Sequence, residues 1–504
     1  MRGGNDTFAK SFCPILTNQL VRCVLNRKAT VFRQTLFQAT TPILYLILTD
    51  KSLPFAISDK MNLISNLLRR LQSSPGDSDK RHRVVIGAVI LSTFFVGFGG
   101  GVIFPILPNL GIILGISPFL VGVILSANRF SRLFANAPAG ALVDRFGTRT
   151  PFVAGMIIQG VATFGYVIAM VSAYPSLWFL PNIPEVWFLS SRIVWGIGSA
   201  AIFATAYTIA SDVSDNGSRG ASMGLIRGGV LFGFPTGVVL GGILSELWGT
   251  VAAFVVATVF AGFAIVISYA TIPETHIDGD EHRSVSLTDV DSSMPAVTVG
   301  LVNFTVLFAY IGALFATLVL FLNHNDLGVF GFDAQASSGI FMAVTVVAAG
   351  TFMFLGGYIS DQTGSRIPTL LTFLGASFVG FSILAVSESV ATLAIACFFI
   401  GAGQGGTSGP LMALLADLTP DERMGRAIGT NNVFGDVGGG LGPIVSLPLI
   451  ELVGFWPIYV ACAVLPVLAG AILLVGIRHE TGQFTPSVKT SEATATNPSA
   501  GYND

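Results

Sequence analysis

Twelve long apolar runs, separated by short polar breaks, constrain this chain more than any other feature of its sequence. A helix needs about 20 apolar residues to cross roughly 30 Å of hydrocarbon. Lipid offers the backbone no hydrogen-bond partner, and the runs are too long for barrel strands, so the sequence predicts an all-α membrane protein with twelve transmembrane helices. The runs lie at 84–107, 118–139, 151–171, 186–210, 220–244, 250–272, 296–322, 335–357, 368–387, 389–415, 425–449 and 454–477.

The composition excludes several classes of protein. Charged residues make up 11% of the 504 residues, where soluble proteins carry roughly 25%. The net charge is −2, so the chain has no basic excess for nucleic acid. The four cysteines follow no metal or disulfide spacing, and no Gly-x4-Gly-Lys motif is present, so we expect no metal, no cofactor and no ATP-driven step. Nor do the runs contain a His/Asp/Glu cluster for catalysis, so an enzyme is not expected.

The positions of the basic residues predict the orientation. Beyond residue 83, the loops after odd-numbered runs contain no Lys or Arg. By the positive-inside rule, both termini of this multi-pass protein are expected in the cytoplasm, with the chain in the cell membrane. The arginines of the opposite set of loops are Arg145, Arg149, Arg219, Arg283, Arg366, Arg423, Arg426 and Arg478.

Composition also predicts the domain boundaries. Residues 1–83 form a partly disordered N-terminal extension, 84–272 and 296–477 are two six-helix bundles, 273–295 is a polar cytoplasmic linker, and 478–504 is a disordered tail rich in Ser and Thr. Residues 1–60 match neither a secretory signal nor the rest of the chain. We therefore hypothesise that the native protein starts at Met61.

An internal repeat relates the two bundles. The segment from Gly140 to Pro151 recurs from Gly357 to Pro368, 217 positions later. Three further pairs match at an offset of 205, and they are Asp212 with Asp417, Glu246 with Glu451, and Gly249 with Gly454. Duplicated halves in transporters place the binding site at their interface near the middle of the membrane.

The repeated segment resembles the hallmark loop of the major facilitator superfamily, Gly-x3-Asp-Arg-x-Gly-x-Arg between the second and third spans. The resemblance implies two pseudo-symmetric six-helix bundles that transport by alternating access, with the loop as a latch between them. Asp144 is expected to face a helix N-terminus, and Gln362 in the position of Arg145 implies a weaker second latch. The candidate gating residues are Gly140, Asp144, Arg145, Gly147, Arg149, Gly357, Asp361, Gly364 and Arg366.

Two other segments are similar to signatures of the same superfamily. Arg192 in the fourth run resembles its fourth-helix arginine, which implies a cavity position and a link to proton coupling; a structural arginine near the outer surface is the alternative. Glycines four residues apart in the fifth run resemble the signature of the proton-driven drug exporters, although Phe234 separates Gly233 from Pro235. Helix packing alone explains such a ridge equally well. The residues concerned are Gly229, Gly233, Pro235, Gly237 and Gly241, with Gly442 and Pro443 in the eleventh run.

Charges inside the runs are functional candidates because they are costly in lipid. Asn128, Arg129, Arg132 and Asn136 share one face of the second run, and Arg227 lies in the fifth. Asp436, in the eleventh run, is the only acid well inside any run. In the superfamily fold the second and eleventh spans meet, so we hypothesise that Asp436 pairs with Arg129 or Arg132. Such a pair could switch with the gate or could be a static clamp.

The resemblance implies a central cavity built from spans one, four, seven and ten. A glycine- and proline-rich stretch from Gly97 to Pro108 predicts a flexible gate in span one. Four arginines against one acid favour anionic or neutral solutes over cations, and Asp436 is the main group able to carry a proton, although an arginine partner would argue against that role. Candidate cavity residues are Arg192, Asn303, Tyr310 and Gln404, with Asn128 and Arg132 nearby.

We therefore expect a monomeric secondary transporter of a small organic solute. Efflux is favoured, with protons as the candidate coupling ion. The alternatives are an importer or uniporter of an organic anion, and a membrane sensor or scaffold that kept the fold without transport. The expected partners are the solute and the lipid bilayer, with no nucleic acid.

Overall fold

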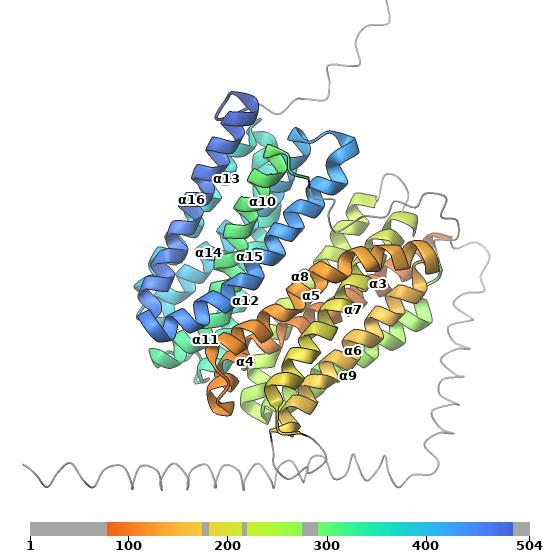
Figure 1. The fold of residues 1–504 in the computed structure, drawn as a ribbon, viewed down its shortest axis with the longest axis vertical. Helices are drawn as coiled ribbons and strands as arrows, with labels where there is room; N and C mark the ends of the chain where they lie inside the picture. The colour runs from red at the N-terminus through yellow and green to blue at the C-terminus, as the bar shows by residue number, and fades with distance from the viewer. Residues whose placement is uncertain (1–77, 174–180, 214–218, 275–290, 487–504) are drawn as a thin grey trace, which may run out of the picture. The chain divides into compact units, whose positions relative to one another are not determined.

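Every apolar run folds as a helix (Figure 1), and glycines with positive φ make several of the turns between helices. The computed structural model describes residues 78–173, 181–213, 219–274 and 291–486. The hypotheses about residues 1–60, most of the linker and the tail lie outside these ranges. Glycines with positive φ end the helices at Gly147 (74°), Gly249 (88°), Gly364 (64°) and Gly454 (83°), where a side chain would strain the backbone.

In the described ranges the first half has seven helical segments, because its first span is divided at Val102. They are α3 (Ser78–Gly101), α4 (Ile103–Leu114), α5 (Pro118–Phe146), α6 (Arg149–Ser172), α7 (Pro184–Val213), α8 (Arg219–Trp248) and α9 (Thr250–Thr271).

The second half repeats this order, and its first span is interrupted by a π-helical segment, η1. Its segments are α10 (Met294–Leu307), η1 (Phe308–Leu314), α11 (Phe315–His324), α12 (Ala334–Gln362), α13 (Arg366–Ala385), α14 (Val390–Leu418), the short 3-10 turn η2 (Asp421–Arg423), α15 (Met424–Val453) and α16 (Phe455–Thr481).

Twelve spans follow from these segments. In the described part of the chain, eleven helical stretches are long and apolar enough to cross a membrane. The twelfth, α5, has 29 residues, but Arg129 and Arg132 interrupt its apolar sequence. The protein is therefore an all-α membrane protein.

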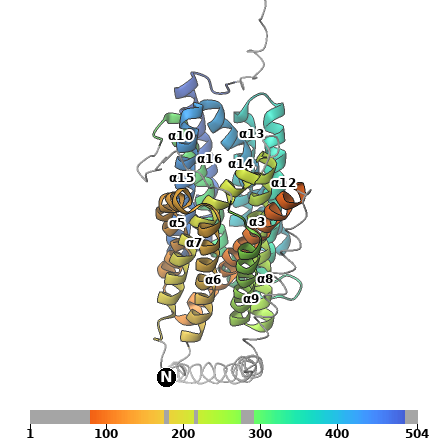
Figure 2. The ribbon, with the colours of Figure 1, turned by 90° about the vertical axis from the view of Figure 1, so that its right-hand side faces the viewer.

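Packing repeats between the halves as the sequence does. In the first half α3 packs on α8, α6 on α7 and α5 on α7; in the second half α10 packs on α15, α13 on α14 and α12 on α14. Across the halves, α5 packs on α15 and α8 on α12. These two contacts are equivalent, because α5 corresponds to α12 in the repeat and α8 corresponds to α15. Two pseudo-symmetric six-helix bundles result, and most of their helices run close to the vertical in Figure 2.

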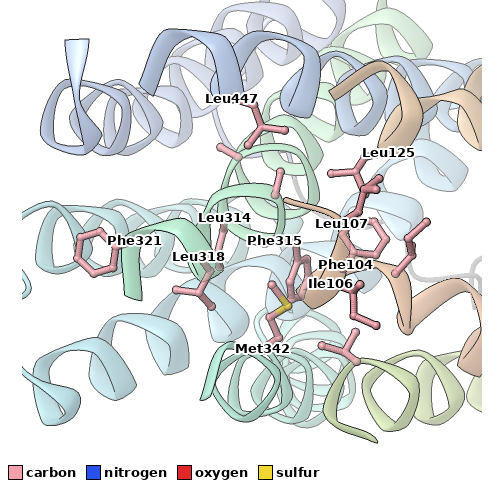
Figure 3. Packing of buried hydrophobic residues seen from close by; sticks show 14 of the residues in the cluster. Phe104, Ile106, Leu107, Leu125, Leu314, Phe315, Leu318, Phe321, Met342 and Leu447 are labelled. Carbon is pink, nitrogen blue, oxygen red and sulfur yellow. The ribbon is translucent and has the colours of Figure 1, made fainter. Parts of the chain in front are cut away.

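Among the described residues, the apolar core joins the two halves at one end. We call the side with the turns at Gly147 and Gly364 the motif side, and the other the far side. One core cluster near the far side contains residues of both halves, among them Phe104, Leu107 and Phe315 (Figure 3). Two further large clusters, near the motif side, are each confined to one half. In Figure 1 the helices of the two halves accordingly converge toward α4 and α11 and diverge at their other ends.

Candidate functional site

The contact between α5 and α15 crosses from one half to the other. Small residues let the two helices approach, since a Cβ on Gly122 would overlap the carbonyl of Pro443. The Ser126 hydroxyl donates a hydrogen bond to the carbonyl of Gly440. These contacts lead from the far side to mid-depth, where the helices carry charged side chains.

Asp436 on α15 pairs there with two arginines of α5. Arg132 donates from Nε to Oδ2 at 3.2 Å and from Nη2 to Oδ1. Arg129 donates from Nη1 to Oδ1 at 3.3 Å. The exposed fractions of the side chains are 9% for Asp436, 16% for Arg129 and 25% for Arg132. Because the carboxylate is nearly buried, removing it leaves two arginines without a counter-ion between the halves, which is costly.

Arg192 on α7 is the most deeply buried charge of the site, with 1% of its surface exposed. Its Nη2 donates to the Leu125 carbonyl at 2.7 Å and to Asn128 Oδ1 at 2.5 Å, and its Nε to the Ile124 carbonyl at 3.3 Å. Its guanidinium lies 6.0 Å from the ring centroid of Phe104. Arg192 has no carboxylate partner within the described residues and is held by dipoles against α5, away from any surface.

The other predicted polar residues differ in their burial and in their contacts. The Asn303 amide donates to the Asn431 carbonyl at 3.0 Å, and Gln404 is half-buried with no side-chain partner among the described residues. Tyr310 is buried in η1 and stacks edge-on against Phe315 in the shared core. Asn136 is exposed, and the side chain of Arg227 lies outside what the structure describes.

The first loop motif is closed by a glutamate that sequence reasoning did not single out. Glu274 accepts hydrogen bonds from the backbone N–H groups of Thr148, at 2.6 Å, and Arg149, at 3.3 Å. A carboxylate is favoured at the N-terminus of α6 by the helix dipole. Glu274 thus takes the type of position expected for Asp144, whose side chain is not described. The Arg149 guanidinium donates to the Tyr269 carbonyl at 3.1 Å, and that of Arg145 lies over Phe146.

The second loop motif holds a compact ion cluster. Arg366 pairs with Asp361 and donates from Nε to Asp417 Oδ2 at 3.0 Å. All three residues belong to the second half. One of them, Asp417, is also the repeat counterpart of Asp212 in the sequence. Gly357 has open space where its Cβ would be, as does Gly140 in the first motif.

On the far side, Glu246 of α8 binds the N-terminus of α12 in the other half. Its carboxylate accepts from the backbone N–H groups of Asp333, at 2.9 Å, and Ala336, at 3.3 Å. Its repeat match to Glu451 was a signal in the sequence, but nothing there indicated the partner.

A chain of uncharged hydrogen bonds and a cavity of about 480 Å³ lie beside this contact. Asn323 donates to Asn109 at 3.2 Å, Asn109 to Gln335 at 3.1 Å, and Gln335 to Ser245 at 2.6 Å. Each half contributes to this chain, so it closes the far side together with the apolar core.

The glycine ridge of α8 lies against α3. A Cβ on Gly233 or Gly237 would overlap the carbonyls of Phe94 and Phe98, one helical turn apart. Phe234 instead points toward Phe104 and Phe315, with ring centroids 5.4 and 6.0 Å away. The outer ridge members and the span-eleven glycine also allow close backbone approach; these are Gly229 against Ile90, Gly241 against Val102, and Gly442 against Gly312.

A duplicated helical bundle with an ionised contact between its halves is the architecture of a membrane transporter. The family model of the Major Facilitator Superfamily matches residues 89–443, with a second match over 352–498. This chain belongs to the Major Facilitator Superfamily, a family of transporters rather than enzymes.

Curated relatives share most of this chain at low identity. It is 23% identical to "Multidrug resistance protein 2" of Bacillus subtilis over 77% of this chain and 92% of that protein. It is 24% identical to "Multi-drug resistance efflux pump PmrA" of Streptococcus pneumoniae over 73% of this chain and 90% of that protein.

Solved structures show the same fold. A bacterial homologue of the human lysosomal transporter Spinster, in an inward-facing and occupied conformation, has a TM-score of 0.62 at 17% identity and covers 80% of this chain and 98% of its own. The human organic anion transporter MFSD10 has a TM-score of 0.55 at 17% identity and covers 79% of this chain and 100% of its own.

Proposed function

We propose that this protein is a secondary transporter that exports a small organic solute by alternating access. The observation that carries the proposal is the uneven join between the halves: one shared core near the far side, and separate cores near the motif side. Two rigid bundles joined in this way can rock about the α5–α15 and α8–α12 contacts. The names of the curated relatives support export as the direction.

In the proposed orientation the motif side faces the cytoplasm, as do both termini. The arginines of the loops on that side support this assignment. The protein is proposed to act as a monomer in the cell membrane. The described structure then corresponds to a state whose outer side is closed by α4, α11 and the Glu246 contact.

The proposed gating mechanism has one element on each side of the membrane. On the outer side, Glu246 releases the N-terminus of α12 when the halves separate. On the inner side, the loop motifs latch the halves when they close. Between them, Asp436 holds Arg129 and Arg132 across the interface. Since arginine effectively keeps its proton, Asp436 is the group in this cluster that can carry one.

Transport is tested by reconstituting the protein in proteoliposomes and measuring uptake and efflux under imposed pH gradients. The solute panel contains lipophilic drugs and organic anions. Accumulation of a solute against its gradient, driven by the pH gradient, is expected. If no solute moved under any gradient, the result would favour a membrane sensor or scaffold and overturn the proposal.

Asp436→Asn tests the coupling role within the same assay. If Asp436 carries the proton, transport by this variant loses its dependence on the pH gradient while facilitated exchange of solute continues. An unchanged pH dependence would remove Asp436 from proton transfer. Arg478→Gln, at the end of α16 and outside the cluster, is the control.

A second candidate is an importer or uniporter of an organic anion. The excess of arginines at mid-depth favours it, and the name of one fold neighbour, an organic anion transporter, is in line with it. The direction of flux separates the two candidates. Net uptake without a pH gradient supports the uniporter, and gradient-driven extrusion supports the exporter.

A further inference from the structure

The arginine cluster at the α5–α15 contact has more charge than its one acid can neutralise. Arg129, Arg132 and Arg192 lie close enough to interact electrostatically, and Asp436 is the only carboxylate among the groups that act on Arg129. Three positive charges against one negative charge leave an excess of two. Uncompensated charge in a membrane is costly and is retained where it binds something.

The excess is directed at an open position on Arg129. A guanidinium has five N–H donors, and Arg132 directs two of its nitrogens at Asp436. Arg129 makes a single protein hydrogen bond, from Nη1, within the described residues. The side chains of Arg129 and Arg132 are 16% and 25% exposed, so neither is sealed inside the contact. The planar fork of arginine matches a carboxylate or sulfonate.

Arg192 supplies field rather than a binding surface. It is 1% exposed, and backbone carbonyls and Asn128 accept from its Nε and Nη2. Its Nη1 is buried without a hydrogen-bond partner among the described residues, so it too is closed to a ligand from outside. Its positive charge nevertheless acts on Arg129. Any cation entering this region meets a net repulsion, whereas an anion is attracted by all three arginines.

Apolar surfaces lie next to the cluster. Phe104 lies under Arg192 and packs edge-on against Phe315, with ring centroids 6.2 Å apart. On α15, Gly439 lies against Arg129, Gly438 against the backbone of Phe304, and Gly440 against the ring of Phe130. Apolar and aromatic residues therefore border the α5–α15 contact.

We propose that Arg129 and Arg132 bind the anionic group of the transported solute, and that Asp436 is an internal counter-ion that competes with it. The solute is an organic acid with one carboxylate or sulfonate on an apolar, aromatic body. This inference rests on the proposed transport function and names its substrate class. When the solute binds, its anion shares the guanidinium groups with Asp436, which loosens the link between α5 and α15.

The test uses three probes of one shape and different charge: 1-naphthoate, 1-naphthalenemethanol and 1-naphthylmethylammonium. Binding to the purified full-length chain is measured by calorimetry. Naphthoate is expected to bind at least tenfold more tightly than the alcohol, and the ammonium most weakly. Equal binding of the three probes, or tighter binding of the ammonium, overturns the inference.

The variants separate a binding site from a structural clamp. Arg129→Gln is expected to weaken naphthoate binding tenfold or more and to leave the alcohol unchanged, with partial rescue by Arg129→Lys. Asp436→Asn, which removes the competitor, is expected to strengthen naphthoate binding severalfold. A clamp alone predicts the reverse, because loosening the interface would weaken all binding. Arg478→Gln also removes one guanidinium and is expected to change neither the affinity for naphthoate nor that for the alcohol. The melting temperature confirms that each variant is folded.

Flux of the same probes in proteoliposomes distinguishes the failure of each proposal. Transport of the alcohol or the ammonium without selectivity for naphthoate would overturn the anion site and leave the transport function standing. Selective binding of naphthoate with no flux of any solute would overturn the transport function and leave the anion site standing.

Discussion

At the scale of single residues, burial decides what each charge in this protein can do. Asp436 was identifiable from the sequence because it is the only acid well inside an apolar run, and a lone buried acid needs a basic partner. Glu246 and Glu274 were not identifiable in this way. Each binds a helix N-terminus distant in sequence, and such a partner is defined only once the helices are packed.

The ion cluster predicts an unequal response to the loss of its members. Asp436→Ala leaves two arginines without a counter-ion, so we expect a loss of about 3–5 kcal/mol in unfolding free energy. Arg132→Ala leaves the Arg129–Asp436 pair in place and is expected to cost less than half of that. Chemical denaturation in detergent measures both. An equal cost for the two variants would show that the charges do not act as a cluster.

At the scale of elements, the apolar runs gave the helices and their order, but not their interruptions. Span one was predicted as a flexible gate from its glycines and prolines, which stays a prediction; the structure divides the span at Val102, whose own backbone remains helical. The matching span seven changes to the π-helical η1, where Gly312 meets Gly442 closely. Nothing in the apolar pattern of span seven indicates this change, and its close contact with α15 is defined only once the helices are packed.

The glycine ridge of α8 predicts position-specific effects of added side chains. Gly237→Val places side-chain atoms against the backbone of α3, so we expect a loss of about 1–3 kcal/mol. Gly262→Ala, on the open face of α9 with nothing near its Cβ, is expected to stabilise by about 0.5–1 kcal/mol. Melting temperatures in one detergent compare them. Tolerance of Val at Gly237 would contradict the close packing.

The Glu246 contact predicts a weaker outer seal when its carboxylate is lost. Loss of a helix N-cap costs about 1 kcal/mol, so Glu246→Ala is expected to raise the open population about fivefold. A cysteine in place of the buried Leu107, in a background lacking the four native cysteines, reports opening by its rate of modification with an impermeant maleimide.

The repeat supplies the control for this experiment. Glu451→Ala removes the matching glutamate, which is exposed at the end of α15 and has no hydrogen-bond partner among the described residues. In this variant, the cysteine that replaces Leu107 should be labelled at the same rate as in the parent. Equal rates for both glutamate variants would mean that Glu246 does not hold the seal.

At the scale of the whole molecule, the two-bundle architecture was predictable because a duplicated sequence folds twice into the same unit. The state of the molecule was not predictable. Which end of the halves shares a core depends on how α4 and α11 meet, and both ends of each span are apolar in sequence.

Locking the far side should stop transport. Asn109→Cys with Gln335→Cys replaces a hydrogen-bonded pair that joins the halves at 3.1 Å. Joining the two cysteines with a short cleavable thiol-reactive crosslinker is expected to abolish flux in proteoliposomes, and cleavage of the crosslinker should restore it. Each single-cysteine variant serves as the control. Undiminished flux after complete crosslinking would show that the halves need not separate there.

The single shared core has a thermodynamic consequence for the cycle. If rocking uncovers apolar surface at one end while covering a similar amount at the other, the total surface exposed to water stays nearly constant. The change in heat capacity between the two states then approaches zero, because that quantity follows exposed apolar area. The enthalpy difference between the two states would therefore hardly change with temperature. A van't Hoff plot of their equilibrium constant would then be close to a straight line.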